Sequence, residues 1–155
     1  MQARDIMTEQ VTTVFEGATV AEAARLMHGC GRGGMPVVNA EGEVVGVVDR
    51  LSLLRLILPK YAADIGDLSF LPEDFKPFES RIEEVGHMLV RDVMRPCDVC
   101  LTADTSVVEL AAVMVTKEVT DVPIVREEHV VGMVSLQDIV DEIVWPHFKR
   151  PEDGE

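Results

Sequence analysis

The sequence predicts an α/β (α+β) fold made of two β-α-β-β-α repeats related by a pseudo-twofold axis. Two observations predict it: the chain matches itself about 87 residues further on, and hydrophobic periodicity changes in the same order in both copies. The size agrees, because 155 residues, 47% of them hydrophobic, can bury one sizeable core or two very small ones. This composition excludes a large multidomain enzyme, a disordered chain and a collagen-like fibre.

The internal match is continuous over about forty residues. Arg4-Asp5-Ile6-Met7 returns as Arg91-Asp92-Val93-Met94, and after the loss of one residue the register continues at an offset of 86. The other matched pairs are 19–22 with 106–109, 35–38 with 122–125, and 44–48 with 130–134. One supersecondary unit is therefore built twice, and each copy is too small to bury a core alone.

Each repeat is predicted to contain a capped helix, a β-hairpin and a second helix, in that order. Thr19 and Ser106 each stand three residues before a glutamate, which is the pattern of a capping box. The hairpins are expected at 36–48 and 124–134, and the second helices at 51–58 and 136–145. The predicted boundaries are 1–58 for the first repeat, 59–89 for a connecting segment, 90–148 for the second repeat and 149–155 for a polar tail.

The connecting segment is long for a compact domain. A helix is expected to resume at 79–85, with Ile82 and Val85 on one apolar edge. We expect the apolar side chains of this segment to hold it against the repeats or against a second subunit. These side chains are Phe70, Leu71, Phe75 and Phe78.

Charge and hydropathy restrict the partners. With 28 acidic and 14 basic residues the formal net charge is −14, which repels nucleic acid and anionic lipid. No apolar run approaches the roughly 20 residues that span a bilayer, and residues 1–5 lack the apolar stretch of a signal peptide. A cytoplasmic protein is expected, and the odd number of cysteines, three, does not make a disulfide framework.

The repeated motifs resemble a tandem pair of cystathionine-β-synthase-like (CBS) domains, the Bateman module. The resemblance rests on the two Asp-Ile/Val-Met openings, the two hydrophobic-Pro-Val/Ile strands, and Gly132-Met133-Val134-Ser135-Leu136-Gln137-Asp138, which fits the family's Gly-x-x-Ser/Thr-x-x-Asp adenosine signature. It implies a regulatory module with two pseudo-symmetric clefts that binds adenine nucleotides, often pairs as a homodimer and carries out no chemistry on its ligand. Under this hypothesis a protein partner or a second subunit reads the ligand-induced change.

Ser135 and Asp138 can be interpreted from their chemistry alone. At the start of a helix, free N–H groups favour an anion, so a phosphate could bind beside the Ser135 hydroxyl. The Asp138 carboxylate could accept hydrogen bonds from both ribose hydroxyls. The alternative is that Ser135 is only an N-cap and Asp138 only a favourable acid in the first turn.

The resemblance also implies which residues form the rest of this cleft. Hydroxyl groups of Thr8 and Thr12 would bond phosphate or adenine, and apolar side chains would sandwich the base, unless those are ordinary core residues. Some relatives carry basic residues where this chain has Thr120 and Asp121, so AMP or ADP, with or without Mg²⁺, is favoured over ATP. The remaining predicted contacts are Val11, Val122, Pro123, Gly132 and Met133.

The first repeat departs from the signature. Asp49 stands where the family has Ser or Thr, and Ser52 stands at the position of the ribose carboxylate. Because Asp49 is a strong N-cap, it would compete with a phosphate for the same helix end. The cleft of the first repeat, the first cleft, is therefore predicted to be degenerate. Its remaining candidate residues are Val47, Met35, Arg32 and Val99.

Other motifs were weighed and set aside. Residues 29–34 satisfy G-x-G-x-x-G, but they follow a helix and open a strand, the reverse of a dinucleotide-binding turn. Cys97-Asp98-Val99-Cys100 is a single C-x-x-C, and Val99 is expected on the strand equivalent to the one that carries Thr12. We interpret the two cysteines as buried thiols without a metal or redox role. No catalytic constellation is recognisable. The alternative function is a ligand-independent dimeric adaptor for a protein partner.

Overall fold

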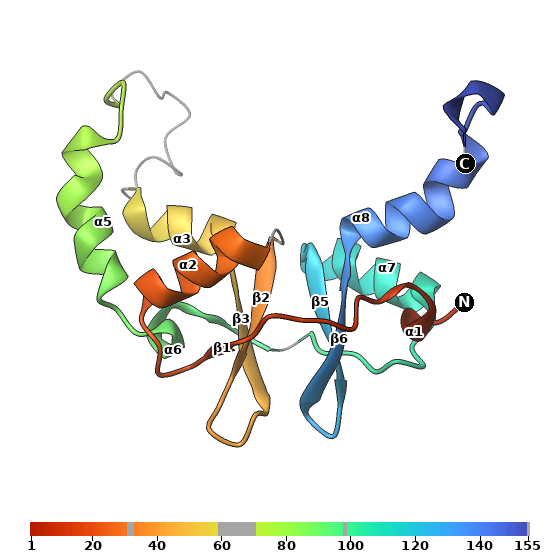
Figure 1. Cartoon of the computed structure of the whole chain (residues 1–155), viewed down its shortest axis with the longest axis horizontal. Helices are drawn as coiled ribbons and strands as arrows, with labels where there is room; N and C mark the ends of the chain where they lie inside the picture. Colours follow the sequence, from red (N-terminus) through yellow and green to blue (C-terminus); the bar gives the residue numbers. More distant parts are fainter. Residues whose placement is uncertain (31–32, 59–70, 98, 155) are drawn as a thin grey trace. The chain divides into compact units, whose positions relative to one another are not determined.

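A computed structural model describes residues 1–30, 33–58, 71–97 and 99–154 of the chain (Figure 1). The chain divides into two compact units that do not coincide with the two halves of the sequence. Unit 1 contains residues 1–11, 42–44 and 97–155, and unit 2 contains residues 12–41 and 45–96. Each unit therefore combines parts of both repeats. The mixed α and β content agrees with the predicted fold class.

Unit 2 is built on a four-stranded sheet in the order β1-β2-β3-β4. β1 (Val14–Phe15) runs parallel to β2 (Gly34–Val38), and β3 (Val44–Asp49) pairs antiparallel with β4 (Arg95–Pro96). Its helices are α2 (Val20–Cys30), α3 (Arg50–Ile57), α5 (Glu79–Gly86) and α6 (Val90–Val93), with a short 3-10 helix, η1 (Lys76–Phe78), before α5.

Unit 1 repeats the plan with the second hairpin. β5 (Asp121–Arg126) and β6 (His129–Ser135) pair antiparallel, and the helices are α1 (Ala3–Ile6), α7 (Val107–Lys117) and α8 (Leu136–Ile139). Leu101 forms a parallel bridge with Ile124. This bridge is the counterpart, 87 residues on, of the pairing between Val14 and Val37.

Both predicted caps lie at helix starts, and Thr19 completes a capping box because its backbone N–H donates to Glu22 Oε2 at 3.3 Å. The Thr19 hydroxyl accepts from the backbone N–H of Glu22 at 3.2 Å, and Ser106 accepts from that of Glu109 at 3.1 Å. Each cap satisfies one of the N–H groups that has no partner inside its helix. The helices then bury one apolar stripe, which consists of Val20, Ala23 and Met27 in α2 and of Val107, Leu110 and Met114 in α7.

Each unit has its own hydrophobic core of buried aliphatic and methionine side chains. The core of unit 2 comprises Val14, Ala23, Met27, Met35, Val37, Val48 and Val90. The core of unit 1 comprises Ala3, Val99, Val107, Leu110, Met114, Val119, Val122, Ile124, Val134 and Ile139.

The opening segments of the two repeats are exchanged between the units. Ala3 near the N-terminus donates its N–H to the carbonyl of Thr105 at 2.8 Å, so the start of repeat 1 packs with repeat 2. Reciprocally, Val90 donates to the carbonyl of Ala18 at 2.8 Å, so the start of repeat 2 packs with repeat 1. Neither sequence repeat is therefore a folding unit by itself.

The last helix differs from the prediction of one continuous helix over 136–145. α8 ends at Ile139 and continues as a π-helical turn, η2 (Val140–Val144), and a 3-10 turn, η3 (Trp145–His147). Pro146 explains the change, because it lacks an N–H and its ring crowds the carbonyl four residues earlier. Within the predicted polar tail, Pro151–Asp153 form a further 3-10 turn, η4.

The connecting segment contains the predicted helix as α5. Val85 on this helix is buried, and Arg81 donates from Nε to the carbonyl of Leu56 at 2.9 Å, which fixes α5 beside α3. Phe75 and Phe78 contact each other edge to face with ring centroids 6.0 Å apart, and Phe75 is half exposed. The described residues therefore do not provide the expected anchoring of Phe75, and Phe70 lies outside them.

Two expectations from the sequence are wrong. Cys97 and Cys100 form a disulfide and are half-buried, whereas two buried thiols were expected. Their Cα atoms lie 6.1 Å apart, a separation that a disulfide spans. Val99 and Thr12 were expected on strands, but both lie in irregular backbone before the strand pairing begins at Leu101 and Val14.

Candidate functional site

The predicted nucleotide residues of the second repeat gather around the end of β6 in unit 1. The strand register sets Pro123 opposite Met133 and Asp121 opposite Ser135. On the other side of β6, Thr8 and Met133 exchange two backbone hydrogen bonds of 2.9 Å each. The structure thus brings the opening segment of the first repeat to the strand that carries the adenosine signature.

Ser135 and Asp138 form a reciprocal capping box at the start of α8. The backbone N–H of Asp138 donates to Ser135 Oγ at 3.1 Å, and the backbone N–H of Ser135 donates to Asp138 Oδ2 at 2.8 Å. The structural alternative for this pair, an N-cap with an acid in the first turn, is therefore present. Asp138 Oδ1 accepts no hydrogen bond from the described residues, so one carboxylate oxygen remains for a ligand hydroxyl.

Thr120 and Asp121 lie beside the same helix end. The Thr120 carbonyl accepts from the N–H of Leu136 at 2.9 Å, and the Thr120 hydroxyl donates to Asp121 Oδ2 at 3.0 Å. Asp121 is buried, with 9% of its surface exposed. Because the Leu136 and Asp138 amides are already bonded, this helix end has fewer free donors for phosphate than the sequence suggested.

The apolar candidates are mostly core. Val122 and Met133 have no exposed surface, and Pro123 and Gly132 are buried as well. In this conformation they match the alternative of ordinary core residues rather than a sandwich for a base. Val11 is half-buried in unit 1, whereas Thr12 is exposed and belongs to unit 2.

The corresponding helix end in unit 2 is filled by its own side chains. Asp49 caps α3, as predicted, and its Oδ1 accepts from the N–H of Ser52 at 2.7 Å and from the Ser52 hydroxyl at 2.8 Å. Its other oxygen, Oδ2, accepts from Arg95 at 2.8 Å. Both carboxylate oxygens are engaged, and a negative charge already occupies the helix end that an anion would need.

Arg95 is a residue that the sequence analysis missed. It stands 87 residues after Thr8, and the strand pairing sets it opposite Val47. Its Nε is buried and has no hydrogen-bond partner among the described residues. The repeat offset could have identified Arg95, because position 95 corresponds to position 8. The first cleft therefore has an arginine where the second cleft has Thr8.

The other candidates for the first cleft belong to different units. Met35 and Val47 are buried in unit 2, with 0% and 6% of their surface exposed. Val99 belongs to the core of unit 1. Arg32 lies outside the described residues.

A cavity of about 810 Å³ opens in unit 1, and none of the predicted contact residues lines it. Arg4 and Arg126 contribute two positive charges to its wall, and the hydrogen bond from the Thr102 hydroxyl lowers the pKa of Asp104 there. The remaining lining residues are Asp5, Met7, Glu9, Ala103, Val125, Glu127 and Val131. Acidic groups outnumber the two arginines, so the wall does not favour an anion.

The described ranges contain neither a membrane-spanning helix nor a metal site. No helix within them is long and apolar enough to cross a membrane. Among the same residues, no group of three or more His, Cys, Asp or Glu side chains is placed to hold a metal ion.

Comparison with known proteins identifies the family. The CBS domain family matches residues 3–59 and 90–144, so the chain belongs to this family and is a tandem CBS pair, a regulatory type of module. The CBS domain of a membrane protein from Sphaerobacter thermophilus has a similar structure, with a TM-score of 0.72 and 26% identity, covering 93% of this chain and 88% of that one.

Two curated relatives come from Methanocaldococcus jannaschii. Inosine-5'-monophosphate dehydrogenase is 25% identical over 154 residues, which are 99% of this chain and 26% of the enzyme. The uncharacterized protein MJ1404 is 29% identical over 139 residues, which are 89% of this chain and 31% of that protein. The chain therefore spans about a quarter to a third of the length of these relatives.

Proposed function

We propose that the chain is a non-enzymatic sensor module that binds one adenine nucleotide, AMP or ADP in preference to ATP, at the Ser135–Asp138 end of β6. The observation that carries the proposal is the contrast between the two repeats. Asp138 keeps one carboxylate oxygen unbonded, whereas both oxygens of Asp49 are held by Ser52 and Arg95. Among the described residues at these two helix ends, Asp138 Oδ1 is the carboxylate oxygen left without a hydrogen bond, and it is the proposed acceptor for a ribose hydroxyl.

The preference for few phosphates follows from charge. Asp121 is buried beside the end of α8, and the whole chain carries a formal net charge of −14. Each added phosphate brings more negative charge toward this carboxylate, and a partly desolvated site screens that repulsion poorly. Mg²⁺ would reduce the repulsion by neutralising part of the phosphate charge.

Signalling requires that the nucleotide bind one arrangement of the chain better than another. Thr8 is hydrogen-bonded to Met133, so a ligand at the end of β6 would contact segments from both sequence repeats. Such a ligand would stabilise the packing of the N-terminal segment on β6. A homodimer partner or a regulated protein would then respond to that change.

Isothermal titration calorimetry tests the proposal. The parent chain is expected to bind one AMP per chain, and Asp138→Ala to weaken binding by roughly 10- to 150-fold, because a hydrogen bond to a charged acceptor is worth about 1.5–3 kcal/mol. Ser52→Ala is the matched control from the other repeat and should leave affinity unchanged. Circular dichroism of each variant verifies folding, since Asp138 also caps α8.

Two results would refute this assignment. One is the absence of binding heat with AMP, ADP and ATP at millimolar concentration. The other is a reversed pattern, in which Ser52→Ala or Asp49→Ala abolishes binding while Asp138→Ala binds like the parent. The second result would assign the ligand to the first repeat.

An adaptor function remains the second candidate because of exposed apolar side chains after β6. They follow one another at helical spacing through α8, η2 and the residues beyond, and none is buried by the described residues. They are Leu136, Val140, Ile143, Val144, Trp145 and Phe148, of which Phe148 is 73% exposed. Analytical ultracentrifugation separates the two functions, because an adaptor would dimerise with the same affinity whether or not nucleotide is present.

A further inference from the structure

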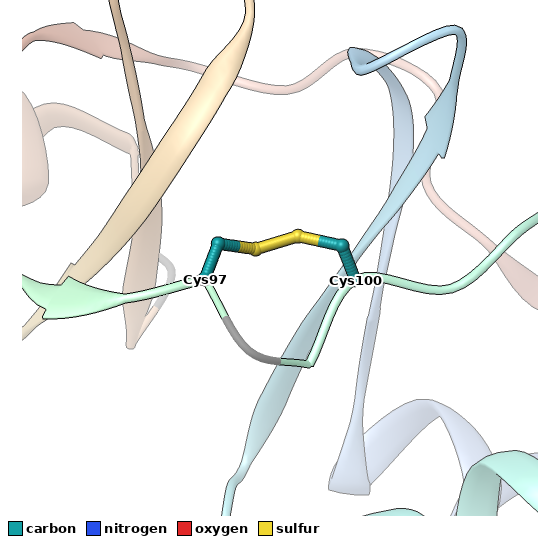
Figure 2. The surroundings of a disulfide bond; sticks show 2 residues. All are labelled: Cys97 and Cys100. Carbon is teal, nitrogen blue, oxygen red and sulfur yellow. A yellow bond between two sulfur atoms is a disulfide. The ribbon is translucent and has the colours of Figure 1, made fainter.

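A disulfide joins Cys97 and Cys100 at the point where the chain leaves unit 2 and enters unit 1 (Figure 2). Both cysteines are half-buried, so each keeps a share of its surface in contact with solvent. Cys30, on α2, is a free thiol. The chain thus carries a C-x-x-C pair in its oxidised form together with an internal reference cysteine.

The residues on both sides of the disulfide are anchored. On the N-terminal side, Arg95 pairs with Val47 and bonds Asp49. On the C-terminal side, the Leu101 N–H donates to the Pro123 carbonyl at 3.2 Å, and the N–H of Val125 donates to the Leu101 carbonyl at 2.8 Å. The residues that flank the disulfide are therefore held by β3 on the N-terminal side and by β5 on the C-terminal side.

We propose that the Cys97–Cys100 pair is a thiol–disulfide exchange site, reduced by an external dithiol and re-formed under oxidising conditions. A thiolate of the dithiol attacks one sulfur and breaks the S–S bond, and the cysteine sulfur released as thiolate takes a proton. The second thiol of the reductant then resolves the mixed disulfide. Two electrons and two protons pass to the chain, which gains two thiols, while the dithiol becomes a disulfide.

The chain acts in this exchange as the acceptor, not as a catalyst. A reactive catalytic cysteine needs a lowered thiol pKa, commonly from a helix N-terminus, but Cys97 follows the short strand β4. An acceptor disulfide needs only a reachable sulfur, because the incoming reductant supplies the thiolate. Partial exposure of both cysteines meets that requirement.

Reduction is expected to loosen the anchored segment without unfolding either core. Closing a four-residue ring restricts the opened chain by an entropy equivalent to about 20-fold in an equilibrium constant. Leu101 directly follows the ring, so its hydrogen bonds with Pro123 and Val125 should open more often after reduction, by up to about 20-fold if the ring segment opens with them. This consequence does not depend on nucleotide binding.

Differential alkylation with mass spectrometry tests the exchange site on the full chain. The native protein is equilibrated in two glutathione buffers, one poised as in the cytosol and one as in the endoplasmic reticulum. We expect Cys97 and Cys100 to be alkylated only in the reducing buffer, and Cys30 to be alkylated in both. Protection of the pair in both buffers would show a permanent structural disulfide, labelling in both would show that the bond does not form, and either result overturns the proposal.

Hydrogen exchange tests the consequence. The amides of Leu101 and Val125 should exchange faster, by up to about 20-fold, in the reduced protein and in the double variant Cys97→Ser/Cys100→Ser. Cys30→Ser is the matched control and should retain the difference between the oxidised and reduced states. Equal exchange rates in the two states of the parent would overturn the inferred loosening, with circular dichroism used to show that both states are folded.

Discussion

The glycines at equivalent positions of the two hairpins should differ in their tolerance of a methyl group. A β-carbon at Gly46 would lie 2.6 Å from the backbone carbonyl oxygen of Arg95 and 2.6 Å from Met94 Sδ. The three atoms nearest to a β-carbon at Gly132 all belong to the Met7 side chain, with Sδ at 2.5 Å, Cγ at 2.9 Å and Cβ at 3.2 Å. A flexible methionine can rotate away, whereas the Arg95 carbonyl belongs to the β3–β4 pair.

These contacts set the expected free-energy changes. Overpacking costs about 1–3 kcal/mol, and replacing glycine by alanine returns about 0.4–1 kcal/mol by restricting the unfolded chain. Gly46→Ala should therefore lower the free energy of unfolding by about 2 kcal/mol, because strands must separate. Gly132→Ala should lower it by about 1 kcal/mol or less.

Urea unfolding followed by circular dichroism measures both variants. Gly86→Ala, at the end of α5, is the matched control: its β-carbon would meet the Ala21 side chain at an ordinary 3.6 Å, so stability should be unchanged or slightly increased. A larger loss for Gly132→Ala than for Gly46→Ala would refute the reasoning. So would equal, negligible losses for both.

Three further outcomes are expected. Leu110→Ala should lower the free energy of unfolding by about 2–5 kcal/mol in the same urea assay, because this side chain has no exposed surface in the core of unit 1. Ser106→Ala should cost about 1 kcal/mol by removing the cap of α7, while Val108→Ala, at an 80% exposed position, should change the urea midpoint little. The hydrogen bond and the charge repulsion from Glu43 raise the pKa of Glu128, so the folded state favours the protonated form of Glu128. This contribution to the free energy of unfolding is present at acidic pH and is lost as the pH rises through the raised pKa. An NMR titration should show that Glu43→Gln returns the Glu128 pKa toward its ordinary value, and an unchanged raised pKa would contradict this cause.

The local elements were predictable because their signals lie within a few residues of one another. Ser106 and Thr19 cap their helices through a residue three positions away, and Asp49 caps α3 in the same way. The hairpin of β5 and β6 likewise follows from adjacent β-branched runs. Short-range patterns therefore indicated helix starts and strand pairs correctly.

The features missed depend on residues distant in the sequence or on bond formation. The ion pair of Arg95 with Asp49 joins two residues that are 46 positions apart in the sequence, and no local pattern predicts it. The disulfide of Cys97 and Cys100 was missed because a lone C-x-x-C without helix context was interpreted as buried thiols. For the candidate site, the sequence named the group around Ser135 but not the burial of Met133, which depends on how unit 1 packs.

The exchanged opening segments also govern how the chain can fold during synthesis. Ala3 finds its partner, the Thr105 carbonyl, only after a further 102 residues have been made, since the hydrogen bond joins positions 3 and 105. At about 5–20 residues per second the N-terminal segment waits on the order of 5–20 s for that partner. A ribosome that pauses before residue 105 therefore leaves Ala3, Ile6 and Met7 without the core of unit 1 against which they pack.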